Sequence, residues 1–313
     1  MADPNLLICV GATKAGTSWL YRYLHDHEEC HVRAVKECCY FLTLHARNLM
    51  PQLIAISALI RDCGARLIGS EAADNVSKML TFGRKVYDMA VLSLDRTADR
   101  AYLNYQHPDR DRTDETALQG VTPHYSLLDT PQIERVAQQL LPVKIFYLIH
   151  DPLERLWSHV RTHAELTLSV GKYFMALYQS FLVRILFSNG EVHIVKLGDY
   201  LANVERFDAV FDRTDFHIEF TENLTDELRF SVMWLFFGIT ATSPAKVTPA
   251  HVGLPAPFQE SLRGDTLQFL KPQYDFVAKH FGILPEAGQK KLGDFGMIKQ
   301  DSNGYFYCQE GGA

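Results

Sequence analysis

The feature that most restricts the fold of this chain is a strand, a glycine-rich turn and a helix start within its first twenty residues. Residues 6–10 (LLICV) form a short apolar run that predicts a buried strand. Residues 11–18 (GATKAGTS) follow directly, and apolar side chains recur at helical spacing from Trp19 onward. A turn in this position lets backbone N–H groups converge on an anion, which the helix N-terminus also attracts. The sequence therefore predicts a phosphate-binding loop.

The residues of this loop differ from the nucleoside-triphosphatase pattern GxxxxGK[ST]. Lys14 stands two residues before Gly16, and no Lys-Ser or Lys-Thr pair is available there to hold magnesium. A lysine supplies a point charge to a phosphate, while threonine and serine supply hydroxyl donors. The predicted anion ligands are Gly11, Thr13, Lys14, Ala15, Gly16, Thr17 and Ser18.

The rest of the pattern predicts an α/β fold. Residues 143–149 (VKIFYLI) are almost continuously apolar, as expected for a strand of a parallel sheet that is covered on both faces. Asp151 and Pro152 then favour a helix start. We expect further strands at 191–197 and 216–220, and further helices at 173–187, 200–211 and 223–237. Strands that alternate with helices indicate a P-loop-like central parallel sheet flanked by helices on both faces.

We predict a single domain over residues 1–313 that carries one polar insertion. Residues 96–119 are the most polar stretch of the chain, with HPDRDRTDE at its centre, so we place the insertion at about 80–119. Such a segment is either a solvated surface insertion or a lid over an acceptor pocket.

Composition and charge limit the partners of the chain. A net charge of −6 argues against a general nucleic-acid binder, which usually has a basic face. No apolar stretch is long enough to predict a membrane span, and residues 6–10 are too short a run for a signal peptide. The six cysteines are therefore expected to be free thiols in the cytoplasm. Cys30, Cys38, Cys39 and His45 lack the paired CxxC spacing of zinc sites, so we predict no metal.

Three motifs resemble those of the sulfotransferase family. Residues 14–20 (KAGTSWL) are similar to its 5′-phosphosulfate loop, K-x-G-T-[ST]-x-L. Residues 150–158 (HDPLERLWS) resemble its second motif, R-[DN]-P-x-x-R-x-x-S, which also follows a strand. Residues 36–41 (KECCYF) resemble a K-E-x-x-[YF]-F block of bacterial members and of the glycan O-sulfotransferases. With weaker likenesses at 198–200 and 216–239, the resemblance covers roughly residues 5–285.

The resemblance implies a sulfotransferase that uses 3′-phosphoadenosine-5′-phosphosulfate (PAPS) as its donor. It implies transfer of the sulfuryl group to a hydroxyl of a small-molecule or glycan-like acceptor, with release of adenosine 3′,5′-bisphosphate. By the same resemblance, Lys14 would stabilise the leaving oxygen and Glu37 would take the proton of the acceptor. Trp19 would stack on the adenine, and His150 with Ser158 would hold the 3′-phosphate.

Two positions depart from the family pattern. His150 stands where the second motif has an arginine, which is always charged and binds phosphate in a fork. Because histidine is only partly charged near neutral pH, we expect weaker donor binding that improves as the pH falls toward 6. Val121 stands where the family block E-K-[TS]-P-x-Y has a lysine, which removes a positive charge and weakens the case for a carbohydrate acceptor.

Two other functions remain open. A P-loop kinase or nucleotidase would need an acidic magnesium ligand, for which Asp151 is the candidate, and donor binding without magnesium would exclude it. A non-catalytic relative that binds adenosine 3′,5′-bisphosphate as a sensor or scaffold is consistent with His150 and Val121. Within an enzyme, His31 and His107 are reserve candidates for the base.

Overall fold

A computed structural model of the protein describes most of the expected core. The described residues are 5–32, 36–37, 39–43, 117–139, 141–167, 174–240, 256–282, 284, 286–294, 298–300 and 306–308, with single positions at 76, 79, 80, 83 and 86. Most of the predicted insertion at 80–119 lies outside the described residues, and so does His107. Among the helices that the model does describe, none combines the length and apolarity that a membrane crossing requires.

A parallel sheet forms the centre of the fold, as the sequence predicts. Its strand order is β2-β3-β1-β4-β5, and every neighbouring pair is parallel. The two central strands, β1 and β4, are buried almost throughout, which explains their near-continuous apolar sequences. The strands are β1 (Asn5–Gly11), β2 (Cys30–Val32), β3 (Ala117–Val121), β4 (Val143–Ile149) and β5 (Phe216–Phe220).

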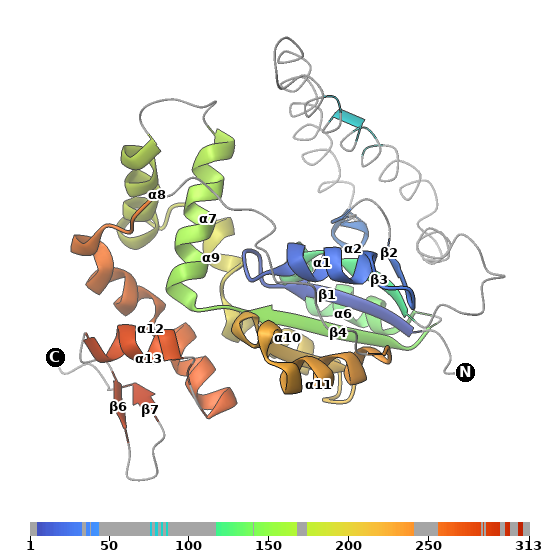
Figure 1. The fold of residues 1–313 in the computed structure, drawn as a ribbon. Coiled ribbons are helices and arrows are strands. Elements are labelled where there is room, and N and C mark those ends of the chain that lie inside the picture. Colours follow the sequence, from blue (N-terminus) through green and yellow to red (C-terminus); the bar gives the residue numbers. More distant parts are fainter. Residues whose placement is uncertain are drawn as a thin grey trace.

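Helices lie on both sides of this sheet and beyond one of its ends (Figure 1). They are α1 (Thr17–His25), α2 (Tyr40–Thr43), α6 (Thr130–Ala137), α7 (Pro152–Thr167), α8 (Phe174–Ser188), α9 (Val192–Lys196), α10 (Tyr200–Asp208), α11 (Glu227–Phe237), α12 (Arg263–Phe281) and α13 (Glu286–Asp294). Short 3₁₀ turns occur at η1 (Pro123–Leu127), η2 (Thr221–Thr225) and η3 (Glu260–Leu262). Two short antiparallel strands, β6 (Ile298–Gln300) and β7 (Phe306–Cys308), pair near the C-terminus.

Alternate residues of β4 contact helices on opposite faces of the sheet. Phe146 packs edge-on against Phe237 of α11, with ring centroids 4.9 Å apart. The next residue, Tyr147, faces Tyr200 of α10 and accepts a hydrogen bond from Asn203 Nδ2 at 3.2 Å. This alternation follows from the two-residue period of a strand. The predicted arrangement, a parallel sheet with helices on both faces, is therefore confirmed.

One predicted strand is wrong. Residues 191–197 (EVHIVKL) form the short helix α9, which buries Ile194 and exposes Val192 and His193. Glu191 adopts a left-handed conformation (φ 49°) that turns the chain into this helix. The apolar residues of this segment fit a strand period and a helical period equally well, and a segment this short offers no further local signal.

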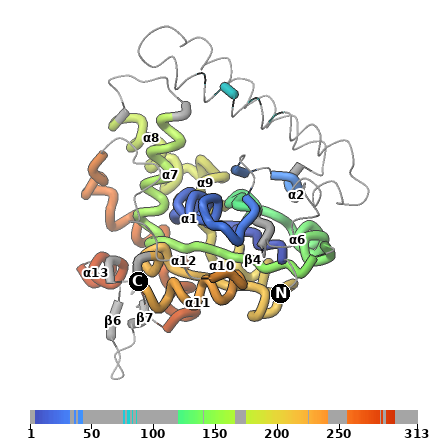
Figure 2. The backbone as a smooth tube through the Cα atoms, turned by 45° about the vertical axis from the view of Figure 1, so that its right-hand side comes forward, coloured from blue at the N-terminus to red at the C-terminus, as the bar shows by residue number. Residues whose placement is uncertain are grey.

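The carboxyl ends of β1 and β4 bring two distant segments to the same edge of the sheet. Because the strands are parallel, the turn after β1 and the start of α7 after β4 emerge side by side. Figure 2 shows α7 leaving β4 beside α1, with α8 and α9 gathered around it. The two segments that the sequence singles out thus lie at one end of the sheet.

An aromatic layer between α1 and α11 should dominate the stability of one face. Trp234 is fully buried and stacks on Tyr23, with ring centroids 4.5 Å apart. We expect Trp234→Ala to lower the free energy of unfolding by about 3–5 kcal/mol, because it leaves a large cavity in this layer. Leu235→Ala is the matched control, since Leu235 is 79% exposed and its loss should change stability by less than about 0.5 kcal/mol. Urea unfolding of the two variants would contradict this assignment if it gave equal losses.

Candidate active site

The turn between β1 and α1 has the backbone shape of an anion-binding loop. Lys14 (φ 73°) and Gly16 (φ 83°) both adopt the left-handed conformation, and the N–H of Ala15 donates to the carbonyl of Ala12 at 3.1 Å. Left-handed residues within such a turn orient successive N–H groups toward one point. The α1 helix then begins at Thr17 and adds N–H groups that have no partner within the helix.

Thr221 ties this loop to the ends of two other strands. Its hydroxyl lies 2.7 Å from the carbonyl oxygen of Ala15 and 3.0 Å from that of Ile149. The methyl group of Thr221 also lies so close to Gly16 that an added Cβ there would meet it at 2.9 Å. Gly16 is thus required both by its backbone conformation and by this contact. Gly11 ends β1 directly against the ring of Tyr147, where an added Cβ would clash, and its contact with an anion stays a prediction.

Two lysines supply positive charge to the loop. Lys36 Nζ donates to Ser18 Oγ at 2.8 Å and lies 3.5 Å from Thr17 Oγ1. Lys14 is half-buried on the turn itself. Thr13 Oγ1 is buried and has no hydrogen-bond partner among the described residues. A buried hydroxyl of this kind calls for an explanation, and a bound anion would provide one.

Charged groups from several segments of the chain influence the pKa of Lys14. Burial is the main cause that lowers the pKa of the Lys14 ammonium below its ordinary value. The positive charges of Arg161 and Lys36 lower it further, and the carboxylates of Glu165 and Glu37 oppose them. Two of these residues belong to α7, so the helix of the second motif contributes to the electrostatics of the loop.

The predicted base, Glu37, is connected to the loop through Lys36. Its carboxylate lies 3.2 Å from Lys36 Nζ through one oxygen and 3.6 Å from His124 Nδ1 through the other. Glu37 itself has a left-handed backbone (φ 65°). Ser18, Lys36, Glu37 and His124 therefore form a continuous polar chain. Spacing in the sequence did not indicate that His124 would lie beside Glu37.

The side chain of His150 contacts an acidic neighbour, Glu222. Its Nδ1 lies 2.7 Å from Glu222 Oε1, and the same oxygen accepts the N–H of Asp151 at 3.3 Å. Burial lowers the pKa of His150, but the hydrogen bond and charge of Glu222, with the charges of Asp151 and Glu154, raise it above its ordinary value. The position predicted to hold a 3′-phosphate is therefore flanked by a carboxylate that the sequence interpretation missed.

Asp151 caps α7, as predicted, and both of its carboxylate oxygens have hydrogen-bond partners. Its Oδ1 accepts the N–H of Glu154 at 3.0 Å and lies 3.0 Å from Lys291 Nζ, while Tyr274 donates to its other oxygen at 3.2 Å. Glu154 pairs with the same Lys291 at 2.9 Å. These contacts argue against the use of Asp151 as a magnesium ligand and hence against a kinase.

The polar face of α7 is turned into the protein. Ser158 is half-buried, and its carbonyl oxygen accepts a hydrogen bond from Thr162 at 3.0 Å. Arg155 is buried, with guanidinium nitrogens near the carbonyl of Ile194 (3.5 Å) and near His159 Nδ1 (3.4 Å). Helix periodicity places these side chains together, but only the fold shows that α9 covers them.

His159 marks the centre of this buried polar region. Burial is the main cause that lowers the pKa of His159 to about 2, and the charges of Arg155, His193, Lys14 and His124 add to the effect. His159 is thus neutral at physiological pH. The charges that shift the pKa of His159 come from the loop (Lys14), from η1 (His124) and from α9 (His193). The loop, η1, α7 and α9 therefore surround one region.

Other predicted residues lie in the core. Trp19 is 8% exposed, stacks on Tyr23 at 5.6 Å and meets Phe230 edge-on at 6.3 Å, so its contact with adenine stays a prediction. Val121 is buried at the end of β3. Further sequence candidates are distributed as follows: Cys30 and Cys39 are buried, His31 lies half-buried on β2, and Cys38 and His45 lie outside the described residues.

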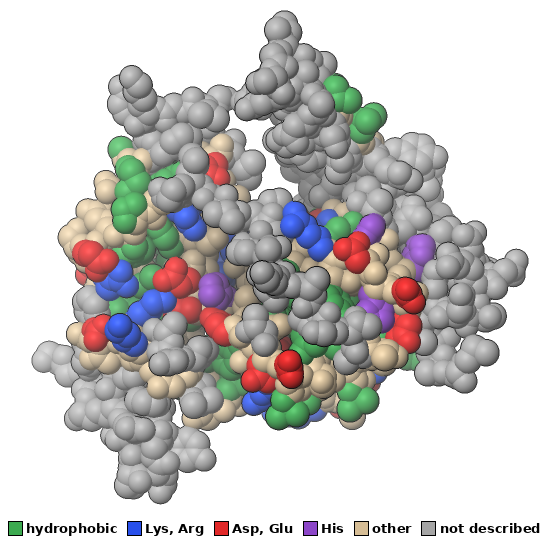
Figure 3. Space-filling model, in the orientation of Figure 1, with side chains coloured by type: hydrophobic (Ala, Val, Ile, Leu, Met, Phe, Trp, Pro, Cys, Tyr) green, Lys and Arg blue, Asp and Glu red, His purple; other side chains and the backbone are tan. Residues whose placement is uncertain are grey.

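Charges of both signs are mixed on one face of the molecule. On the face shown in Figure 3, acidic and basic side chains lie next to one another among the coloured residues. Local groups, such as the two lysines at the loop, therefore decide where an anion is attracted.

Comparison with known proteins identifies the fold. No family model and no curated protein matches the chain. A sulfotransferase from Alicyclobacillus acidocaldarius has a similar solved structure, with a TM-score of 0.55 and 18% identity over 92% of this chain and 100% of that one. Two further solved structures are similar at lower TM-scores. A sulfotransferase domain from the curacin biosynthetic pathway has a TM-score of 0.41 and 12% identity over 95% of this chain and 98% of that one. A sulfotransferase domain from the Synechococcus PCC 7002 olefin synthase has a TM-score of 0.43 and 13% identity over 88% of this chain and 96% of that one. The first likeness shows that the chain has a sulfotransferase fold.

Proposed function

We propose that the protein is a PAPS-dependent sulfotransferase that transfers a sulfuryl group to the hydroxyl of a small-molecule or glycan-like acceptor and releases adenosine 3′,5′-bisphosphate. The observation that carries the proposal is the loop after β1. This loop combines a left-handed turn with the ammonium groups of Lys14 and Lys36. It also holds the buried hydroxyl of Thr13, for which the described part of the chain supplies no hydrogen-bond partner. These groups suit the 5′-phosphosulfate end of the donor, which carries several negative charges.

The residues divide the chemical work between them. In an in-line transfer, the acceptor oxygen forms a bond to sulfur while the bond from sulfur to the bridging oxygen of the 5′-phosphate breaks. The electron pair of the broken bond stays on that bridging oxygen, where Lys14 stabilises the negative charge. Glu37 takes the proton of the acceptor hydroxyl. Lys36 contacts both Ser18 and Glu37, so it holds the base next to the donor loop.

The opposite end of the donor site fits less well. A 3′-phosphate at His150 and Ser158 would approach the carboxylate of Glu222, which lies 2.7 Å from the His150 ring. A phosphate and a nearby carboxylate repel each other, so donor binding requires either a displaced Glu222 or a protonated His150. This observation keeps a second candidate open, a relative that binds adenosine 3′,5′-bisphosphate weakly and does not catalyse transfer.

Removal of the Glu222 charge should strengthen nucleotide binding. We expect Glu222→Gln to tighten the binding of adenosine 3′,5′-bisphosphate about tenfold at pH 6, because one unfavourable charge contact is worth roughly one pKa unit. In this variant the bound phosphate replaces Glu222 as the negative charge that favours the protonated form of His150. Glu227→Gln, at the exposed start of α11, is the matched control and should leave the affinity unchanged. Calorimetric titration gives both values. Unchanged or weaker binding by Glu222→Gln would remove His150 from the nucleotide site.

The affinity of the unmodified protein should also depend on pH. The pKa of His150 is raised, so its charge is complete below its ordinary pKa and is lost as the pH rises through the raised value. Binding of adenosine 3′,5′-bisphosphate should therefore weaken between pH 6 and pH 8. A flat affinity over this range, measured by the same titration, would count against His150 as a ligand.

Two experiments test the function itself. Calorimetry with adenosine 3′,5′-bisphosphate in the absence of magnesium should give one binding site, whereas binding that requires magnesium would favour a kinase. Incubation with PAPS labelled in its sulfuryl group, together with a panel of phenols, alcohols and sugars, should then yield a labelled acceptor. Nucleotide binding without transfer to any acceptor would support the non-catalytic candidate.

A further inference from the structure

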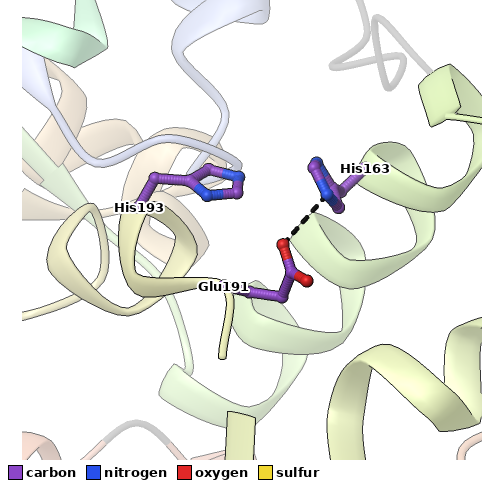
Figure 4. A group of neighbouring side chains, drawn as sticks. All are labelled: His163, Glu191 and His193. Atoms are coloured by element: carbon purple, nitrogen blue, oxygen red, sulfur yellow. Dashed lines mark ion pairs between the residues drawn. The ribbon is translucent and has the colours of Figure 1, made fainter. Parts of the chain in front are cut away.

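A group of metal-ligating side chains lies outside the proposed active site. His163 comes from α7, Glu191 from the residue before α9, and His193 from α9 itself. Their ligand atoms all lie within 4.8 Å of one another. Figure 4 shows the two imidazoles and the carboxylate directed toward a common space between the two helices. The closest pair, His163 Nε2 and Glu191 Oε2, is 3.1 Å apart.

We propose that His163, Glu191 and His193 bind one zinc ion. Two imidazoles and one carboxylate form a known ligand set for zinc, which leaves its fourth position to water. Ligand atoms about 2.1 Å from a tetrahedral zinc lie about 3.4 Å from one another. The 3.1 Å between His163 and Glu191 is within a few tenths of an ångström of this separation, and side-chain rotation of the exposed His193 would bring in the third ligand.

Neighbouring residues fix the orientation of two of the ligands. Arg184 forms an ion pair with the second carboxylate oxygen of Glu191, which leaves the first oxygen directed at His163. Phe181 packs edge-on against the ring of His163, with centroids 4.9 Å apart, and the guanidinium carbon of Arg184 lies 4.6 Å from the centroid of the same phenyl ring. Contacts around the ligands that hold them in place are characteristic of metal sites.

The access path also suits a metal ion. His193 is exposed, so an ion can enter from solvent without rearrangement of the core.

This site departs from the sequence-based expectation of no metal. The helix α8 lies between His163 and Glu191 in the sequence, so no short sequence motif contains all three ligands. The site does not rest on the proposed transferase activity. It would fasten α9 to α7 beside the buried His159, whose ring lies 6.2 Å from that of His193.

Zinc titration of the metal-free full-length chain tests the site. We expect one ion to bind with a dissociation constant of about 10 µM or lower. The variants His193→Asn and Glu191→Gln should each weaken binding at least about tenfold, since each removes one ligand. His25→Asn is the matched control, because His25 is an exposed histidine on α1 beside Asp26, far from α9 in sequence. It should bind zinc as the unmodified chain does.

Two results would overturn the proposal. The first is zinc binding weaker than this limit, or binding that His193→Asn and Glu191→Gln leave unchanged. The second comes from cobalt substitution, which reports the ligand type by absorption: intense near-ultraviolet bands would assign the ion to cysteine thiolates, whereas nitrogen and oxygen ligands give only weak visible bands. Because His193 is exposed, His193→Asn should remain folded, and circular dichroism verifies this before the titration.

Discussion

Lys14→Met is expected to lower the turnover of sulfuryl transfer about 10²- to 10³-fold, as the loss of a fixed charge donor does in other active sites. Lys14 is half-buried, and its backbone is held in a left-handed turn beside Gly16. Its ammonium group is therefore positioned before the donor binds, and burial would strengthen the proposed interaction with the leaving oxygen. Methionine keeps the length of the side chain and removes the charge.

Controls separate the loss of charge from damage to the loop. Lys14→Arg keeps a positive charge and should retain more activity than Lys14→Met. Lys279→Met, at the exposed end of α12, should have the turnover of the unmodified protein. The affinity for adenosine 3′,5′-bisphosphate, measured by calorimetry, shows whether each variant still binds nucleotide. Turnover of Lys14→Met within threefold of the unmodified enzyme would contradict the assigned role.

The pH dependence gives a further signature of Lys14. Since the pKa of its ammonium group is lowered, mainly by burial, the charge is present at low pH and is lost below the pH at which an ordinary lysine loses it. Turnover should therefore fall on the alkaline side, and this fall should be absent from the residual activity of Lys14→Met. A rate profile from pH 6 to pH 10 measures both.

Local sequence signals predict the frame of the fold well. The strand β4 (Val143–Ile149) begins and ends where the sequence predicts, because a nearly continuous apolar run between polar neighbours has few other interpretations. The cap at Asp151 is equally local, since it involves an N–H only three residues away. The turn after β1 combines both kinds of signal, and it was predicted with its helix.

Pairing between distant side chains could not be predicted from spacing. Glu222 reaches His150 across 72 positions of the chain, and Lys36 reaches Ser18 across 18. Such contacts depend on how strands and helices pack, which a single sequence does not encode in its local pattern. The burial of Arg155 has the same origin, because periodicity places it on the polar face of α7 but does not reveal that α9 covers that face.

The second large effect is expected at the base. Glu37→Gln should lower turnover by about 10²- to 10⁴-fold, the usual contribution of a general base. Glutamine has nearly the same shape, and its oxygen can still accept from Lys36, so the loop should keep its structure. What is lost is the capacity to take a proton from the acceptor. Glu205→Gln, on the exposed face of α10, is the matched control.

His124 decides how the result is interpreted. It lies 3.6 Å from Glu37 and could itself take the proton, with Glu37 as the group that orients it. Residues that act as one unit give non-additive losses, so Glu37→Gln combined with His124→Asn should be no slower than Glu37→Gln alone. If the double variant multiplies the two losses, the residues act separately. Full turnover of Glu37→Gln, measured with labelled PAPS at pH 7, would exclude Glu37 as the base.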